Sequence, residues 1–288
     1  MAPTISLPLS RPGGVWLAFS KNPLFWVGLL LLAAIVLIAV FAPLIAPYDP
    51  FEQNIVARLE PPSAEFLLGT DIYGRDVLSR LIYGGRISLL VGFVAILIAM
   101  TIGCTIGIIA GYVDDLFDQL VMGLLDVMLS FPTLLLGLMI AAMLGASLEN
   151  LVIAIAITEI APFARVARAP TIALKQQDFV AAGQALGFGP IRIMGVHILP
   201  NLISDVVVMS SLWMASAIRT EASLSFIGLG VPPPTPTWGS MIREGFENIL
   251  DAWWLAVFPS LAILLTVLAL NLLGDALRDA IDPKLRGE

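Results

Sequence analysis

Long uninterrupted runs of hydrophobic residues dominate the chain, and most of the charged residues lie between these runs. A helix needs roughly 20 apolar residues to cross about 30 Å of hydrocarbon, because each residue adds about 1.5 Å. The runs long enough to cross, some with a few charges inside, predict six membrane-spanning helices at residues 24–46, 87–113, 127–148, 151–166, 201–224 and 252–274. The expected fold class is therefore an all-α polytopic membrane protein.

The composition supports a membrane environment. Hydrophobic residues make up 58% of the 288 and charged residues 13%, whereas soluble domains have about 45–50% and about 25%. The net charge of −7 gives no electrostatic footprint for nucleic acid. A single cysteine, Cys104, excludes an intramolecular disulfide and a cysteine-based zinc site, and we interpret it as a small core hydrophobe.

The spans divide the chain into inner and outer segments. We expect a cytoplasmic segment at 1–23, an anchor helix at 24–46, an outer segment at 47–86, a core at 87–278 and a cytoplasmic tail at 279–288. The anchor begins only after Lys21 and has no small-residue cleavage site, so it is not expected to be a cleaved signal peptide. Within the core, residues 165–200 form an inner loop and residues 228–251 an outer one. Lys and Arg are more numerous on the inner segments, which favours cytoplasmic termini.

The outer segment contains a polar motif at residues 69–80. Thr70 or Asp71 is expected to cap an interfacial helix. Its apolar face would carry Val77, Leu78, Leu81 and Ile82. We interpret Asp76 and Arg80 as a surface ion pair rather than as substrate ligands.

The inner loop predicts a short helix. Asp178 is expected to cap a helix over residues 179–186 that Gly187, Gly189 and Pro190 end. Small residues leave it a smooth surface, at Ala181, Ala182, Gly183 and Ala185. The helix is too polar to span, so it either docks another protein or rests on the membrane as an amphipathic helix.

The outer loop contains the run Val231–Trp238, in which prolines favour a stiff polyproline II segment. It is expected either to face a receptor or to serve as a rigid connector. Trp238, Trp253 and Trp254 are expected in the outer interfacial belt.

Ionisable residues inside spans usually face a bundle interior or a wet cavity. Glu159, Asp126, Asp205 and Arg219 are therefore candidates for lining a translocation path, with Glu159 the strongest. Asp126 alternatively ends a turn before Pro132, and Asp205 and Arg219 alternatively reach the membrane faces or pair with a neighbour.

The sequence lacks the chemistry of an enzyme. It has no Gly-Lys dipeptide and therefore no phosphate-binding P-loop. The single histidine, His197, supports neither a His-based metal site nor a Ser-His-Asp set, and we interpret it as a polar interfacial residue.

Several segments, in this order along the chain, resemble the permease subunits of type I ABC importers, specifically the C-type subunit of the dipeptide/oligopeptide/nickel group. They are the first span with 45–48, Gly69–Arg80, Glu221–Gly230, Pro233–Pro236 and Asn271–Asp279 with Asp282-Pro283. The resemblance implies a permease with six spans and a cytoplasmic coupling helix between spans four and five.

The inner loop is similar to the coupling loop of that family, which reads Glu-Ala-Ala, three residues, Gly, nine residues, Ile, one residue, Leu-Pro. Here Ala181 stands in place of the glutamate and His197 in place of the isoleucine, while Gly187 and Leu199-Pro200 remain. The resemblance implies that this helix lies in a groove of an ATPase subunit. The implied coupling residues are Asp178, Phe179, Val180, Ala181, Ala182, Gly183, Gly187, Phe188 and Pro200. The implied outer motif is Asp71, Arg75 and Asp76.

The resemblance also implies partners and a location. A second homologous permease would complete a heterodimer, two cytoplasmic ATP-binding subunits would hydrolyse ATP with Mg²⁺, and a periplasmic or lipid-anchored binding protein would deliver peptides or related small solutes. The chain itself would bind no cofactor or nucleic acid, would not be an enzyme, and would lie in the bacterial inner membrane among its lipids with both termini cytoplasmic. The alternatives are an ion-gradient-driven secondary transporter, an intramembrane hydrolase and a non-transport scaffold.

Overall fold

The computed structural model describes residues 22–113 and 115–281. The predictions for residues 1–21, Asp114 and residues 282–288 lie outside this range, and these include most of the N-terminal segment, the Asp282-Pro283 motif and much of the tail. Apart from one isolated β-bridge between Thr70 and Asp76, the regular elements of the described residues are helices. They are α2 (Pro23–Val40), α3 (Ala42–Ile45), η1 (Ile55–Ala57), α4 (Val77–Val113), α5 (Leu116–Ser130), α6 (Thr133–Leu144), α7 (Leu148–Lys175), α8 (Asp178–Ala185), α9 (Pro190–Arg192), η2 (Ile193–Ile198), α10 (Leu199–Ile227), α11 (Trp238–Glu247) and α12 (Trp254–Ile281).

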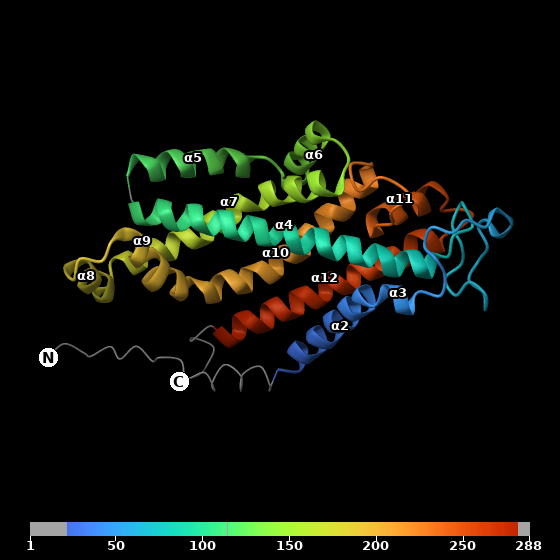
Figure 1. The fold of residues 1–288 in the computed structure, drawn as a ribbon, viewed down its shortest axis with the longest axis horizontal. Coiled ribbons are helices and arrows are strands. Elements are labelled where there is room, and N and C mark those ends of the chain that lie inside the picture. Colours follow the sequence, from blue (N-terminus) through green and yellow to red (C-terminus); the bar gives the residue numbers. More distant parts are fainter. Residues whose placement is uncertain (1–21, 114, 282–288) are drawn as a thin grey trace.

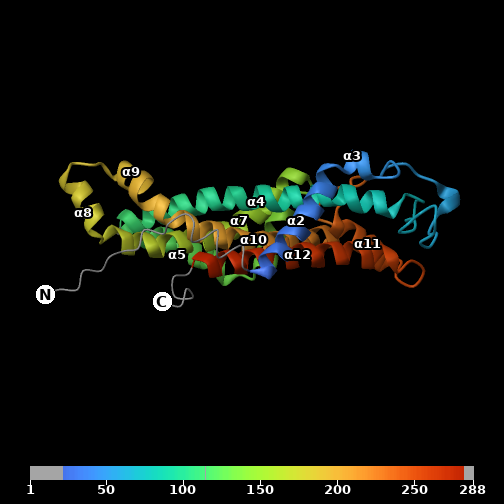
Figure 2. The same ribbon diagram turned by 90° about the horizontal axis from the view of Figure 1, so that it is seen from below.

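The helices form an elongated bundle. The 37-residue α4 runs along most of its length, with α7, α10 and α12 beside it (Figure 1). Helices α8 and α9 lie at one end, and the 47–76 loop and α11 lie at the other in both views (Figure 2). We call these the α8 end and the α11 end.

The closest packing in the bundle joins α4 to α7. Gly103, Gly107 and Gly111 follow one another at intervals of four residues, so they lie on one face of α4. A Cβ on Gly107 would lie 2.2 Å from the carbonyl oxygen of Ala164. Only glycine therefore lets the two backbones approach this closely, as in other membrane helix pairs. Phe163 is fully buried, and Cys104 is buried as predicted.

Within residues 22–113 and 115–281, five helices are long and apolar enough to span a membrane, or six if the bent pair α5–α6 is one span. Helices α2, α4 and α12 contain most of the predicted first, second and sixth spans. The fourth and fifth predicted spans were too short, because α7 continues to Lys175 and the fifth candidate span runs from Pro190 to Ile227.

Residues 127–148 do not form the single continuous helix expected of the third span, although the bent pair that contains them passes as one candidate span. Two helices, α5 and α6, meet there at 96°. Phe131 between them is extended, with ψ of 140°, because the ring of Pro132 disfavours the helical conformation in the residue before it. The run is apolar, but Pro132 divides it into two helices.

The predicted interfacial helix of the outer segment is also wrong. Val77 and the apolar residues after it begin α4 itself. The cap is neither Thr70 nor Asp71 but Asp76, whose Oδ2 accepts hydrogen bonds from the backbone N–H and the hydroxyl of Ser79, both at 2.7 Å.

The outer loop is folded rather than stiff and extended. A turn at residues 233–234 leads into α11, whose start is fixed by a capping box between Thr237 and Ser240. Trp238 and Trp254 are buried, and their indole N–H groups donate to the carbonyls of Leu81 at 3.0 Å and Thr70 at 3.1 Å. Of the three tryptophans expected in an interfacial belt, only Trp253 is exposed.

Candidate functional site

The predicted docking helix exists as α8 and lies at the tip of the α8 end (Figure 1). Val180 is fully buried in the main core and Gly183 is buried beside Phe188. Four of the predicted coupling residues within α8 are exposed, namely Asp178, Phe179, Ala181 and Ala182. One side of the helix therefore packs on the bundle and the other is open to a partner.

The two ends of α8 differ from their predictions in one respect. Gln177, not Asp178, is the N-cap residue, and it makes no side-chain capping bond. At the other end, Gly187 has φ of +81° and its N–H donates to Gln184 O, while the N–H of Phe188 donates to Gly183 O at 3.0 Å. This pair of bonds is a Schellman motif, which requires the left-handed residue that glycine supplies. The prediction that Gly187 ends the helix is confirmed.

The chain after α8 returns through an aromatic stack. The ring of Phe188 lies parallel to the imidazole of His197, with centroids 5.8 Å apart and planes 6° apart. The guanidinium carbon of Arg192 lies 4.0 Å from the centroid of Phe188. Phe179 approaches His197 at 6.4 Å. His197 thus lies in η2, in contact with the region of α8, and Pro200 lies in the first turn of α10 without interrupting it.

A buried ion-pair network occupies the α11 end. Arg75 Nε lies 2.6 Å from Asp71 Oδ2, and Arg80 Nε lies 3.2 Å from the same oxygen. Glu244 of α11 accepts from Arg75 at 2.9 Å and from Arg80 at 3.5 Å. Asp71, Arg75, Asp76 and Arg80 are all at most 4% exposed. The prediction of a surface ion pair between Asp76 and Arg80 is therefore wrong.

Glu244 is the residue of this network that the sequence analysis missed. Burial raises the pKa of its carboxyl above the ordinary value, while the guanidinium of Arg80 opposes this shift. The network joins the segment before α4 to a helix more than 160 residues later, so no local spacing signals it.

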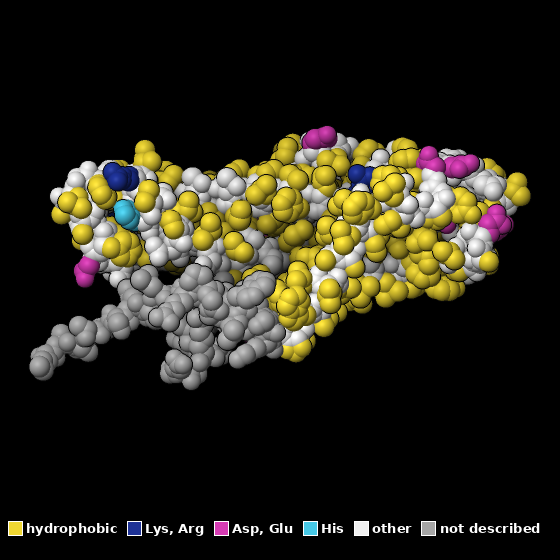
Figure 3. All heavy atoms as spheres, turned by 60° about the horizontal axis from the view of Figure 1, so that its bottom comes forward, with side chains coloured by type: hydrophobic (Ala, Val, Ile, Leu, Met, Phe, Trp, Pro, Cys, Tyr) yellow, Lys and Arg dark blue, Asp and Glu magenta, His cyan; other side chains and the backbone are white. Residues whose placement is uncertain are grey.

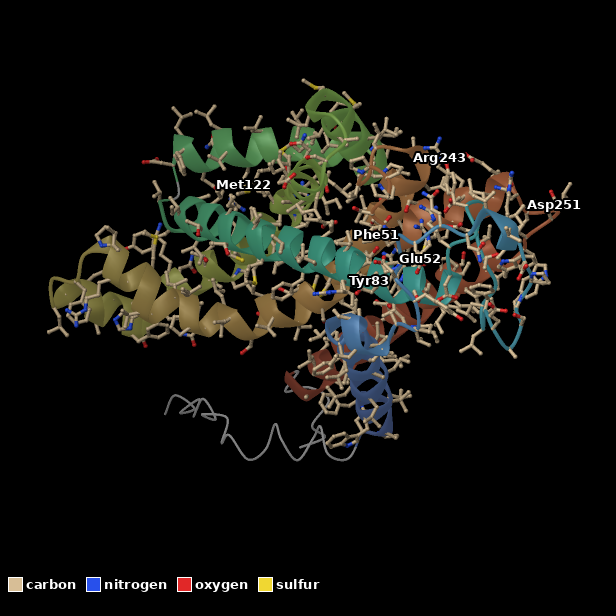
Figure 4. All side chains as sticks on the ribbon, turned by 45° about the vertical axis from the view of Figure 1, so that its right-hand side comes forward. Phe51, Glu52, Tyr83, Met122, Arg243 and Asp251 are labelled. Carbon is tan, nitrogen blue, oxygen red and sulfur yellow. The ribbon has the colours of Figure 1, made fainter. Side chains whose placement is uncertain are left out.

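A cavity of about 380 Å³ opens beside this network. It is lined by side chains of the 72–80 segment, α11 and the 228–235 loop, including Tyr73, Val231, Arg243 and Glu247. Arg243 and Glu247 form an exposed ion pair at 3.1 Å. Figure 4 shows Arg243 at this end of the molecule, with Asp251 at its tip.

The structure does not bring the four candidate pathway residues into one cluster. Glu159 of α7 is buried and interacts with Ser216 and Arg219 of α10. Asp126 of α5 is exposed and pairs with Arg165 at 2.6 Å. Asp205 is exposed on α10. Glu159 and the exposed Arg219 are therefore near each other at the contact between α7 and α10, which we call the polar seam, whereas Asp126 pairs with Arg165 and not with Arg219.

Two further polar contacts in the spans were missed. Glu221 is fully buried and accepts from the Ser225 hydroxyl at 2.8 Å. Arg168 of α7 holds Asp118 of α5, with Nε to Oδ1 at 2.6 Å. The serine four residues after Glu221 is the only local signal for the first contact, and the second joins separate helices.

The surface separates an apolar middle from more polar ends. In Figure 3 hydrophobic side chains cover much of the middle of the visible face, a Lys/Arg and His group lies at the α8 end, and acidic side chains gather at the α11 end. Among the described residues, no group of three or more His, Cys, Asp or Glu could hold a metal ion.

Two family models match the chain. Residues 103–287 match the family described as the inner membrane component of binding-protein-dependent transport systems, and residues 13–62 match the N-terminal transmembrane domain of oligopeptide transport permease C.

Close relatives align over nearly the whole chain. The chain is 46% identical to the di/tripeptide transport system permease protein of Pseudomonas aeruginosa, over 94% of this chain and 91% of that protein. It is 47% identical to the dipeptide transport system permease protein of Escherichia coli, over 99% and 96%. It is 43% identical to the glutathione transport system permease protein of Shigella flexneri, over 98% and 96%.

Proposed function

Because the chain belongs to the family of inner membrane components of binding-protein-dependent transport systems, and is thus a permease subunit of an ABC importer, we propose that it forms half of a translocation pathway for short peptides. The observation that carries this proposal is α8, a short helix with an open face that projects from an otherwise membrane-spanning bundle. The relatives' names, dipeptide, di/tripeptide and glutathione permeases, support the substrate class.

The proposed complex has three kinds of protein partner. A second, homologous permease forms the other wall of the pathway, two cytoplasmic ATP-binding subunits grip the coupling helices, and a solute-binding protein delivers the peptide at the α11 end. ATP and Mg²⁺ are used by the ATP-binding subunits, not by this chain. Both termini and α8 lie on the cytoplasmic side, and the 47–76 loop and α11 lie outside.

The proposed cycle uses α8 as its input. ATP binding closes the pair of ATPases, α8 follows that movement, and α7 and α10 shift against each other along the seam of Glu159 and Arg219. A ligand shifts such a two-state element only through different interactions with its two states, and closure of the ATPases supplies that difference at α8.

Reconstitution tests the proposal. Proteoliposomes that contain both permeases and both ATPases, with binding protein outside and ATP inside, are expected to accumulate a radiolabelled dipeptide. Collapse of ion gradients with ionophores should leave uptake intact, whereas omission of ATP should abolish it. Uptake that follows an imposed ion gradient without ATP would instead favour the secondary transporter. A panel with dipeptide, tripeptide and glutathione identifies the substrate.

A further inference from the structure

Helix α8 has little of its own packing to hold it to the rest of the bundle. Its eight residues bury only Val180 and Gly183, and the return segment carries two glycines, Gly187 and Gly189. A movement of α8 would therefore be absorbed by the flexible return segment unless a further contact joins α8 to the membrane helices.

The aromatic stack supplies that contact. Phe188, the last residue of the Schellman motif, contacts two groups that belong to the next helical segment. The imidazole of His197 lies parallel to its ring, and the guanidinium carbon of Arg192 lies 4.0 Å from its ring centroid. Parallel aromatic rings and a cation over a ring face both attract through the ring quadrupole. Val180 and Ile198 pack in the same core.

Arg192 and His197, the two partners of Phe188, belong to the helical segment that continues into α10. Arg192 ends α9 and His197 lies in η2, a π-helical segment that runs directly into α10, and the whole stretch Pro190–Ile227 forms one candidate span. Single π-helical turns are rare and often found at functional positions. A shift of Phe188 is thus passed to the helix that carries Arg219.

The sequence at this point departs from the general coupling-loop pattern. His197 stands where the coupling-loop pattern has isoleucine. An aliphatic side chain fills similar space but presents no flat face, so it cannot form the parallel contact seen here at 6° between the planes. The imidazole Nε2 is buried and has no hydrogen-bond partner, which agrees with a ring held by stacking rather than by polar contacts.

We propose that the stack of Arg192, Phe188 and His197 makes α8 and the start of α10 move as one unit, so that Phe188 and His197 are positioning residues for coupling. The inference rests on the proposed function, in which α8 receives the movement of the ATPases. It goes beyond docking, because it assigns transmission to three side chains that lie outside α8.

The test separates transmission from docking. In proteoliposomes, Phe188→Leu, His197→Leu and Arg192→Gln are compared with Phe188→Tyr, which keeps the ring, and with Val196→Ala, an exposed neighbour in η2. We expect uptake per ATP hydrolysed to fall about fivefold or more in the two leucine variants, the lower end of ordinary coupling between two sites, and less in Arg192→Gln. Co-purification of the ATPases should be retained, and Phe188→Tyr and Val196→Ala should match the wild type.

A distance measurement between α8 and α10 distinguishes a loss of coupling from a loss of stability. Spin labels at Ala185 and Ile203, both exposed, are placed in a Cys104→Ala background. The wild type should show one narrow distance distribution that shifts with ATP, and Phe188→Leu a broad distribution without the shift.

Two results would overturn the proposal. One is wild-type uptake per ATP in both Phe188→Leu and His197→Leu. The other is a parallel loss of ATPase co-purification in both, since the stack would then serve docking only. Failure of the proposed function itself is recognised separately, because the wild-type complex would then show no ATP-driven uptake.

Discussion

Gly107 shows how one residue sets the distance between two membrane helices. Substitution by alanine would place Cβ 2.2 Å from Ala164 O, so α4 and α7 must separate. We expect Gly107→Ala to destabilise the protein by about 1–3 kcal/mol, the usual cost of overpacking, and to lower the midpoint of thermal unfolding in detergent. Gly123→Ala on α5 is the control, because nothing lies within 4 Å of that Cβ and alanine favours the helix. Equal midpoints for the two variants would contradict the packing argument.

Glu244 holds two buried guanidiniums at the α11 end. Glu244→Gln removes the anion that faces Arg75 and Arg80 and leaves them with Asp71 alone. Breaking a buried ion pair from one side costs about 3–5 kcal/mol, so we expect a clear loss of thermal stability. Glu247→Gln, on the same helix, breaks only an exposed pair with Arg243 and should cost at most about 1 kcal/mol. If the two variants have the same midpoint of thermal unfolding, the buried ion-pair network does not stabilise the fold.

Individual residues were predictable from sequence where a local rule determined them. Gly187 was found because a glycine after a small-residue helix is the usual C-terminal signal, and Cys104 because it lies in an apolar run. Trp238 was misread because its burial comes from α4, which is distant in sequence: its backbone N–H donates to the Ser88 hydroxyl and its indole to Leu81 O. Asp76 was misread because its carboxylate bonds the start of α4, at Ser79, and not Arg80. The glycine repeat at 103, 107 and 111 was present as a signal and was not used.

At the scale of elements, α8 depends on the left-handed residue that ends it. Gly187→Ala strains the φ of +81° by about 1–2 kcal/mol and weakens both bonds of the Schellman motif. We expect the end of α8 to fray, and several-fold less ATPase to be retained when the permease is purified with its partners.

Gly189→Ala is the matched control for this helix. Its φ of −70° is ordinary for any residue and its Cβ would meet nothing within 4 Å, so ATPase retention should equal that of the wild type. Normal retention in Gly187→Ala would show that the ordered end of α8 is not needed for docking.

The elements were predictable to the extent that length and hydrophobicity define them. The apolar runs gave α2, α4 and α12 because each is long and contains no helix break strong enough to divide it. The bend between α5 and α6 was missed because Phe131-Pro132 lies inside a charge-free run, where hydrophobicity alone does not reveal a turn. Helix α11 was missed because its capping residue, Thr237, follows a proline-rich run that favours extended structure.

At the scale of the whole molecule, the two ends differ in what they present. Labelling tests which side each end occupies: in a Cys104→Ala background, Val56→Cys and Ala182→Cys are treated with an impermeant maleimide on spheroplasts. Both positions are exposed in this chain. We expect Val56→Cys to react at once and Ala182→Cys to react only after permeabilisation. Reaction of Ala182→Cys in intact spheroplasts would reverse the proposed orientation and exclude docking of a cytoplasmic ATPase on α8.

The unbroken 37 residues of α4 have a mechanical consequence. At about 1.5 Å per residue the helix is about 55 Å long, well beyond the roughly 30 Å thickness of the hydrocarbon. If this helix tilts as a rigid body by about 5° about its centre, its two ends move by about 2 Å in opposite directions. Binding of the solute-binding protein at one end of α4 would thus displace the other end, near the ATP-binding subunits, without any change of conformation within α4.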